Sequence, residues 1–360
     1  MSPLLKSVEK AGVKGLTQKR NPFSISSADF FSDSELLRSE FVKLINIKQS
    51  NRIAIIPSVS YGMANAVRNI KLTPDQNVIV ASEQFPSNYY PWLRLCEENH
   101  AQLNVVGPPA IREGRGKEWN QRILESINGK TRVVTIGNVH WTDGTRFDLQ
   151  QIRKRTRDVG ALLIVDGTQS VGALPFDVGT LQPDALICAG YKWLMGPYSI
   201  GLAYYGEHFD NGTPIEESWI NRFNSEDFTG LVNYQSRYQP GALRYDVGEH
   251  SNFIGVPMLL QALKQINEWK PARIQEYCQK ISRDAIRQLR ALGYWIEDES
   301  QRGHHLFGIR LPDGAAVDPI KKKLAQKNIA VSFRGDSIRV APHLYNTAAD
   351  LEKLVKALTP

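Results

Sequence analysis

The sequence predicts an α/β protein with a mostly parallel β-sheet sandwiched by helices, followed by a smaller C-terminal α+β domain. Several apolar runs, such as residues 161–165, are too short for a helix standing alone and end abruptly in polar residues, which is typical of buried parallel strands. From residue 257 the pattern changes to two long amphipathic helices followed by short strands and helices. The 360 residues, with a mass of 40.5 kDa, suffice for two domains that share a large core.

In chain order, residues 1–27 form a mixed polar stretch that we expect to be an arm packing on the body. Residues 28–256 would form the large domain, which opens with a helix at Ser34, and residues 257–360 the small one. Apolar runs predict strands of the large domain at 52–56, 77–82, 131–137, 161–165, 184–189 and 199–205. Amphipathic patterns predict helices of the small domain at 257–269, 273–292, 319–327 and 347–358, and apolar runs predict strands at 294–297 and 304–311.

Two stretches of the large domain lack a regular pattern. The polar, glycine-broken residues 112–117 predict an exposed loop. Residues 206–245 have no clear periodicity, and a connection of that length is usually functional or interface-forming.

The residues after the first predicted strand form a possible anion site. Small and hydroxyl-bearing residues precede a helix there, so that backbone N–H groups and the hydroxyls of Ser58 and Ser60 would face outward at the positive helix end. This is a phosphate cradle in physical terms. Serine is also the commonest helix cap, and the motif alone fits that role equally.

The stretch 161–205 brings an acid, an amide and a lysine to one end of the predicted sheet. Asp166 and Gln169 follow one strand, Lys192 follows the next, and ligands of open α/β sheets bind at that end. A partly desolvated lysine loses its proton more easily and can form a Schiff base with a carbonyl. A pyridoxal phosphate enzyme needs such a lysine and a carboxylate facing the pyridinium nitrogen. The alternative is that Asp166 caps a helix and Lys192 lies on the surface.

The segments DGTQSVGALPFDV and DALICAGYKWLMGP resemble class V aminotransferases, and the similarity runs from about Ala28 to the C-terminus. The resemblance implies the fold of type I pyridoxal-phosphate-dependent transferases and the cofactor pyridoxal 5'-phosphate. It assigns Lys192 as the Schiff-base lysine, Asp166 as the catalytic carboxylate at the ring nitrogen and Gln169 as a ligand of the phenolic oxygen. The family often has Ser-x-His-Lys where this chain has Ala189-Gly190-Tyr191-Lys192, and this Tyr-Lys pair is similar to kynureninases, whose tyrosine contacts the cofactor phosphate.

The resemblance extends to further cofactor ligands. The family's Thr-x-x-Ala stretch binds the phosphate, and its positions correspond to the backbone of Val59 and to Ser60. The Phe-Pro-Ser-Asn run at Phe85 resembles the Phe-Pro-Ser-Asp of kynureninases, whose phenylalanine stacks on the cofactor, whereas cysteine desulfurases use a histidine there. The family also has a contact residue at the strand end that corresponds to Trp141.

The C-terminal motif IRVAPHLYNT is similar to that of the kynureninase-like branch, in which its arginine binds the substrate carboxylate. The resemblance therefore assigns Arg339 to the carboxylate of an amino acid, with Arg334 as the second candidate, since a bidentate arginine suits this group. Desulfurases carry a reactive cysteine in this region. This chain has no cysteine after Cys278, which argues against a cysteine desulfurase.

The resulting expectation is a class V aminotransferase-like enzyme acting on an amino acid substrate. A kynureninase-like or other β-carbon lyase is the alternative, and a protein of this fold that binds its ligand without turnover is an alternative of another class. Fold-type I relatives imply a homodimer with active sites at the interface.

Composition limits the other kinds of protein that the chain could be. Three scattered cysteines favour a reducing, cytoplasmic compartment, and no apolar run approaches a membrane span. The net charge of +7 includes the basic run 152–157, which fits a solvated helix face, and no nucleic-acid-binding signature accompanies it. His304 and His305 are adjacent and would point to opposite faces of a strand, so we expect no metal site.

Overall fold

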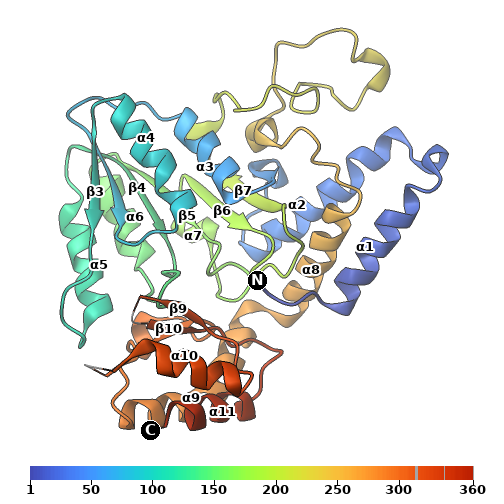
Figure 1. The fold of residues 1–360 in the computed structure, drawn as a ribbon. Coiled ribbons are helices and arrows are strands. Elements are labelled where there is room, and N and C mark those ends of the chain that lie inside the picture. Colours follow the sequence, from blue (N-terminus) through green and yellow to red (C-terminus); the bar gives the residue numbers. More distant parts are fainter. Residues whose placement is uncertain (313–314, 336, 360) are drawn as a thin grey trace.

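The computed structural model describes residues 1–312, 315–335 and 337–359, and its centre is a seven-stranded sheet of order β1-β7-β6-β5-β4-β2-β3 (Figure 1). The strands are β1 (Ile53–Ile56), β2 (Asn77–Ala81), β3 (Gln102–Val106), β4 (Thr131–Gly137), β5 (Leu162–Asp166), β6 (Ala185–Ala189) and β7 (Gly201–Tyr205). β7 pairs antiparallel with β1 and with β6, and the other neighbours pair in parallel. The expected mostly parallel sheet is confirmed.

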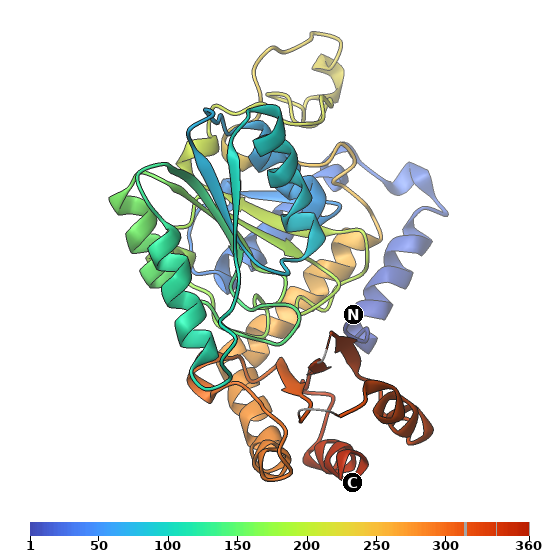
Figure 2. The same cartoon turned by 60° about the vertical axis from the view of Figure 1, so that its left-hand side comes forward.

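Helices cover both faces of this sheet because its strands are apolar on both sides. Along β5, Leu163 and Val165 belong to one buried cluster and Leu162 and Ile164 to the other, as the two-residue period of a strand requires. The first face packs against α2 (Ser32–Leu44), α5 (Arg115–Ser126), α6 (Leu149–Asp158), α7 (Val178–Leu181) and α8 (Gly255–Trp269), and the second against α3 (Val59–Arg68) and α4 (Tyr90–Glu98). Figure 2 shows the resulting three layers.

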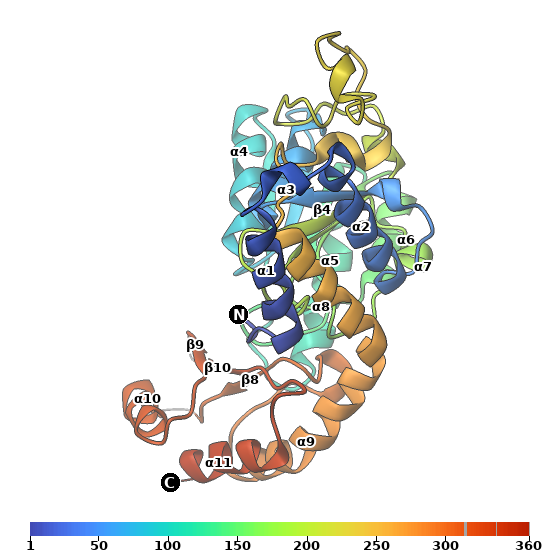
Figure 3. The ribbon, with the colours of Figure 1, turned by 90° about the vertical axis from the view of Figure 1, so that its right-hand side faces the viewer.

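A second, antiparallel sheet of order β8-β10-β9 lies in the C-terminal part of the chain (Figure 3). Its strands are β8 (Phe307–Arg310), β9 (Ser332–Arg334) and β10 (Ser337–Val340), and its helices are α9 (Pro271–Ala291), α10 (Val317–Gln326) and α11 (Ala348–Leu358). One face of the sheet contributes Phe307, Ile309 and Ile338 to a core shared with α9 and α11. Figure 1 shows these helices on the side away from the large sheet, so the other face of the small sheet is turned toward it.

The N-terminal stretch contains a helix, α1 (Lys6–Gln18), which lies along α8 (Figure 3). Two glycines permit the close approach, because a Cβ at Gly12 would lie 2.6 Å from the Met258 sulfur and one at Gly15 would lie 2.0 Å from the Phe253 carbonyl oxygen. Residues before α1 lead the N-terminus to the junction of the two sheets (Figure 1).

The connection from β7 to α8 contains no strand or α-helix among its described residues, and part of it projects from the large unit (Figure 1, yellow). Short 3₁₀ helices lie at Pro22–Ser24, Ser27–Phe30, Ser50–Arg52, Pro86–Asn88, Glu207–Phe209, Phe228–Gly230, Gly241–Tyr245 and Glu299–Gln301.

Three local expectations differ from the structure. Residues 112–117 are not all an exposed loop: α5 begins at Arg115, whose guanidinium is buried in an ion pair with Asp143 at 2.9 Å. Residues 294–297 form only a single bridge, between Trp295 and Arg310. The strand expected from His304 begins at Phe307 instead, because the buried His305 ring bonds to neighbouring chain segments before the strand starts.

Within the described ranges, no group of three or more histidine, cysteine, aspartate or glutamate side chains could hold a metal ion. No helix in the same ranges is long and apolar enough to cross a membrane.

Candidate active site

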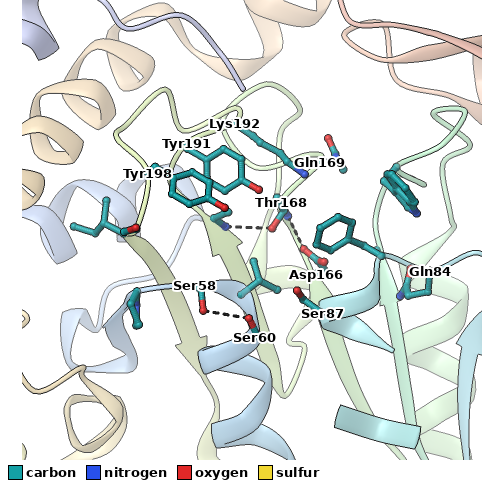
Figure 4. Close-up of a pocket in the computed structure, with 18 of the residues that line it drawn as sticks. Ser58, Ser60, Gln84, Ser87, Asp166, Thr168, Gln169, Tyr191, Lys192 and Tyr198 are labelled. Atoms are coloured by element: carbon teal, nitrogen blue, oxygen red, sulfur yellow. Dashed lines mark hydrogen bonds between the residues drawn. The ribbon is translucent and has the colours of Figure 1, made fainter. Parts of the chain in front are cut away.

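The candidate site is a cavity of about 200 Å³ at the carboxyl ends of the parallel strands (Figure 4). All eight residues expected to contact a cofactor line it: Val59, Ser60, Phe85, Trp141, Asp166, Gln169, Tyr191 and Lys192. They come from the ends of several strands and from the first turn of α3, so segments more than 100 residues apart along the chain meet there. This is where open α/β sheets bind ligands.

Asp166, the last residue of β5, is buried at the floor of the cavity. Its Oδ1 accepts a hydrogen bond of 3.0 Å from the Thr168 backbone N–H, and the Thr168 hydroxyl accepts one from the Ala189 N–H on β6. Burial raises the pKa of Asp166, while the bonds from Thr168 and the charge of Lys192 act in the opposite direction. The carboxylate is therefore held rigidly and gains most from a cationic group placed against it.

Lys192 follows β6 in a tight turn and extends into the cavity (Figure 4). This turn starts at Gly190. Only glycine fits there, because a Cβ would lie 2.5 Å from the Ile200 carbonyl oxygen. The Lys192 Nζ lies 5.0 Å from the centre of the Phe85 ring. Burial lowers the pKa of Lys192 to about 8, with Asp166 opposing the shift and the charges of Arg339 and Arg334 adding to it. Far more of this amine is therefore neutral and nucleophilic near neutral pH than its ordinary pKa of 10.5 would allow.

The first turn of α3 forms the opposite end of the cavity. Ser58 is the N-cap and accepts a bond of 3.2 Å from the Tyr61 N–H, and its hydroxyl lies 3.3 Å from that of Ser60. The N–H groups of the first turn have no partner within the helix, and its positive dipole end favours an anion. The capping role and the anion-binding role therefore coincide.

Aromatic rings form one wall. Phe85 and Trp141 meet edge to face with centroids 5.4 Å apart, and the Trp141 indole N–H donates to the Glu83 carbonyl at 2.6 Å. Across the cavity, the rings of Tyr191 and Tyr198 lie 4.6 Å apart. A flat ring between these walls would be packed on its faces and edges.

Gln169 is fixed by two neighbours outside the cavity. Its side-chain oxygen accepts a bond of 3.2 Å from the Trp193 indole N–H, and its backbone carbonyl accepts one of 2.7 Å from the His305 Nε2. The amide NH₂ is the group that remains available to a ligand.

The two candidate carboxylate-binding arginines approach from the small sheet. Arg339 on β10 donates from Nη1 to the Trp141 carbonyl oxygen at 2.8 Å, and it lines a smaller cavity that also contacts Lys192 and Gln169. Arg334 on β9 places its guanidinium 4.9 Å from the centre of the Trp141 ring. Both arginines therefore reach the Lys192 region, Arg339 at a cavity wall and Arg334 behind Trp141.

Several residues that line the two cavities are not among those predicted from the sequence. Thr168, Tyr198, Ser199, Gln84 and Ser87 line the main cavity, and Met1 and Ser2 line the smaller one. Thr168 could have been found from its position between the two expected ligands. Nothing in the sequence signals Met1 and Ser2, since the bond of 3.2 Å from the Ser2 N–H to the Tyr191 carbonyl depends on how α1 packs.

A comparison with models of protein families identifies the family of this chain. The family model described as "Aminotransferase class-V" matches residues 18–355. The chain belongs to the class V aminotransferase family. Pyridoxal 5'-phosphate is the cofactor of this family, and the residues of the cavity fit it: an anion-binding helix end, aromatic walls, a buried carboxylate and a lysine of lowered pKa meet in one place.

Relatives of this class V protein carry different activities in their names. This chain is 25% identical to an uncharacterized aminotransferase, YcbU, of Bacillus subtilis strain 168, and the alignment covers 89% of this chain and 82% of the relative. A cysteine desulfurase from Thermococcus onnurineus NA1 has a similar fold, with a TM-score of 0.82 at 18% identity, covering 99% of this chain and 92% of that one. The cystine C-S lyase C-DES superposes with a TM-score of 0.86 at 18% identity, covering 99% and 94%.

Proposed function

We propose that this class V protein binds pyridoxal phosphate through Lys192 and acts on an amino acid as an aminotransferase-like enzyme. The observation that supports this best is the position of Lys192, a half-buried lysine with a pKa of about 8, in one cavity with Asp166 and the first turn of α3. A structural lysine has no reason to be desolvated beside an anion site and a buried acid.

Each residue then has a defined task. Ser58, the Val59 N–H and Ser60 would bind the phosphate, as helix N-termini do. Phe85 would pack on the ring, and Asp166 would stabilise a proton on the ring nitrogen. The NH₂ of Gln169 would donate to the phenolic oxygen.

When bound, pyridoxal phosphate supplies an aldehyde that condenses with amines and a ring that accepts electrons from the substrate Cα. Arg339 would hold the substrate carboxylate and thereby orient Cα. Lys192, released by the incoming amine, would take the proton from Cα as a general base, for which a pKa near the working pH is suitable.

The cysteines support a reaction without a thiol intermediate. Cys96, Cys188 and Cys278 are all buried, and burial raises the pKa of the Cys278 thiol to about 12. A persulfide acceptor needs an accessible thiolate, which these residues do not offer. Among lyases, this favours one that uses no cysteine of its own. Such a β-carbon lyase is the second candidate, because removal of the Cα proton by Lys192 would start that reaction too.

The absorbance spectrum of the purified protein, before and after borohydride, tests the proposal. We expect a visible band that borohydride converts into a covalent label on Lys192. Lys192→Ala should lose the label, and Lys154→Ala, an exposed lysine on α6, should keep it. A protein that stays colourless with added pyridoxal phosphate would refute the cofactor assignment.

Product masses from an amino acid panel, with and without pyruvate, separate the reaction classes. A transaminase forms a 2-oxo acid and alanine only when pyruvate is present. A β-carbon lyase releases its product without pyruvate. A coloured protein that converts none of the amino acids would instead indicate a binding protein.

A further inference from the structure

Arg334 and Arg339 project from one face of the small sheet, which also carries Arg310. In the register of β9 and β10, Ser337 lies opposite Arg334 and Ser332 lies opposite Arg339. Directly paired residues share a face and the strand period is two, so Arg334 and Arg339 are diagonal neighbours on the same side. The intervening Ile338 is fully buried in the core on the other side. The arginine face is therefore the one turned toward the large sheet.

Both guanidinium groups end at Trp141, which lines the Lys192 cavity. Arg339 bonds to its carbonyl oxygen at 2.8 Å, and Arg334 lies over its ring at 4.9 Å from the centroid. The contact with the ring holds the Arg334 guanidinium without using its N–H donors. Arg339 thus lines the smaller cavity beside Lys192, and Arg334 stands next to it behind the Trp141 ring.

Neither arginine has a carboxylate partner in the described part of the chain. Arg334 Nη1 donates to the neighbouring Phe333 carbonyl, and its Nε is buried with no hydrogen-bond partner there. By contrast, the buried Arg38 and Arg115 each pair with an aspartate. A partly buried guanidinium without an anion is costly, and its cost falls when a ligand supplies the anion.

The uncompensated charges act on one another. Burial is the largest cause of the lowered pKa of Arg339, and the charge of Arg334 lowers it further. Both arginines also contribute to the lowered pKa of Lys192. Asp166 is needed at the ring nitrogen. The α-carboxylate of an ordinary amino acid compensates one of the two arginines and leaves the other unpaired.

We propose that the substrate is an amino acid whose side chain ends in an anion, with Arg339 binding the α-carboxylate and Arg334 binding the side-chain anion. This inference rests on the proposed function. Aspartate- or glutamate-like dicarboxylic acids are the simplest members of the class. A sulfinate or a phosphate also offers a pair of oxygens to a guanidinium, so amino acids with these groups are tested as separate substrates.

The binding of unreactive acids tests the pair without any turnover. Glutarate and its monoamide have the same size and differ in one charge. By titration calorimetry on the cofactor-loaded protein, we expect glutarate to bind about tenfold more tightly or better, as for a charge-assisted bidentate pair. Arg334→Gln should abolish that difference and leave monoamide binding unchanged, whereas Arg334→Lys should retain part of it. Arg287→Gln, on an exposed position of α9, is the matched control and should change neither affinity.

Steady-state kinetics then compare individual amino acid substrates. Glutamate, aspartate, cysteine sulfinate and O-phosphoserine should each exceed their uncharged counterparts, such as glutamine and asparagine, in kcat/KM, and Arg334→Gln should remove the preference. Equal affinity for glutarate and its monoamide, or a preference for aromatic amino acids, would overturn the inference. If the absorbance band is present and these differences are absent, the inference fails while the cofactor assignment stands. If the band is absent, the cofactor assignment fails, and glutarate titration of the unloaded protein still decides whether the arginine pair binds a dianion.

Discussion

At the scale of single residues, the environment of Lys192 determines its chemistry. Its side chain is half-buried, its amine lies 5.0 Å from the centre of the Phe85 ring, and the charges of Asp166 and of two arginines on the small sheet act on it. Desolvation and like charges favour the neutral amine, and Asp166 limits the shift. The result is a lysine whose protonation changes near pH 8 rather than near its ordinary value of 10.5.

The rate at which the cofactor-free protein takes up pyridoxal phosphate should follow this pKa. Only the neutral amine attacks the aldehyde, so the rate should rise with pH and reach half its maximum near pH 8. Stopped-flow absorbance over a pH series measures it. Arg339→Gln removes a positive charge and should move the midpoint to higher pH. A midpoint near 10.5 in the parent protein would show that the lysine is not desolvated.

The residues that the sequence could predict are those whose signal is local. Asp166 and Lys192 each follow a short apolar run, and the end of such a run indicates the end of a buried strand. Arg115 lacks such a signal, because its burial depends on the ion pair with Asp143, a residue on a different element that also contacts Arg310 far away in the chain. Met1 lines the smaller cavity for the same kind of reason, since its position depends on how α1 packs on the distant helix α8.

At the scale of elements, the hairpin after β4 connects the two sheets. It carries Trp141 to the cavity and Asp143 to a buried cluster, where the carboxylate contacts Arg115 at 2.9 Å and Arg310 on β8 at 3.2 Å. Backbone bonds add to this, as Gly308 on β8 donates to the Asp143 carbonyl at 2.7 Å. The position of the Trp141 wall therefore depends on charges behind it. The neighbouring positive charges and hydrogen bonds outweigh burial and hold the pKa of Asp143 well below its usual range.

Asp143→Asn should destabilise the protein by roughly 3–5 kcal/mol, because it removes the negative charge that pairs with the buried Arg115 guanidinium. Chemical denaturation monitored by fluorescence gives the free energy of unfolding. Asp284→Asn removes an exposed acid from a surface ion pair and should cost less than about 1 kcal/mol. If the free energy of unfolding falls by the same amount in both variants, the buried cluster around Asp143 does not stabilise the fold more than a surface ion pair does.

Strand prediction succeeded in the middle of the large sheet and failed at one edge. β5 and β6 are fully buried and appear as apolar runs, whereas β3 is an edge strand whose residues, Gln102–Val106, are partly exposed and include polar ones. Such a segment has no continuous apolar pattern, and only its pairing with β2 defines it. The expected strand at 294–297 is the opposite case: its residues are mostly buried, yet they form only one bridge, between Trp295 and Arg310.

At the scale of the whole molecule, several large apolar side chains are left on the surface. The connection from β7 to α8 exposes Val232 and Tyr234, which retain 78% and 96% of their accessible surface, and Phe23 after α1 retains 98%. Tyr198, at the rim of the main cavity, retains 68%. Exposed apolar groups on a projecting segment suggest a protein partner, and we propose a second copy of this chain.

Light scattering should therefore give a mass near twice 40.5 kDa. Val232→Glu combined with Tyr234→Ser should shift the protein toward monomers, because a charge and a lost ring weaken an apolar contact. Tyr90→Ser, at an exposed aromatic residue on α4, is the control and should leave the mass unchanged. A monomeric parent protein at micromolar concentration would contradict the proposal.

The position of the first two residues has a practical consequence for handling the protein. Ser2 is bonded to the Tyr191 backbone beside Lys192, so a peptide fused ahead of Met1 would emerge at the smaller cavity that Lys192 also lines. Affinity tags placed there would compete with small molecules for access and distort measured affinities. The other end is farther from this cavity, because α11 ends at Leu358 on the far side of the small sheet (Figure 1).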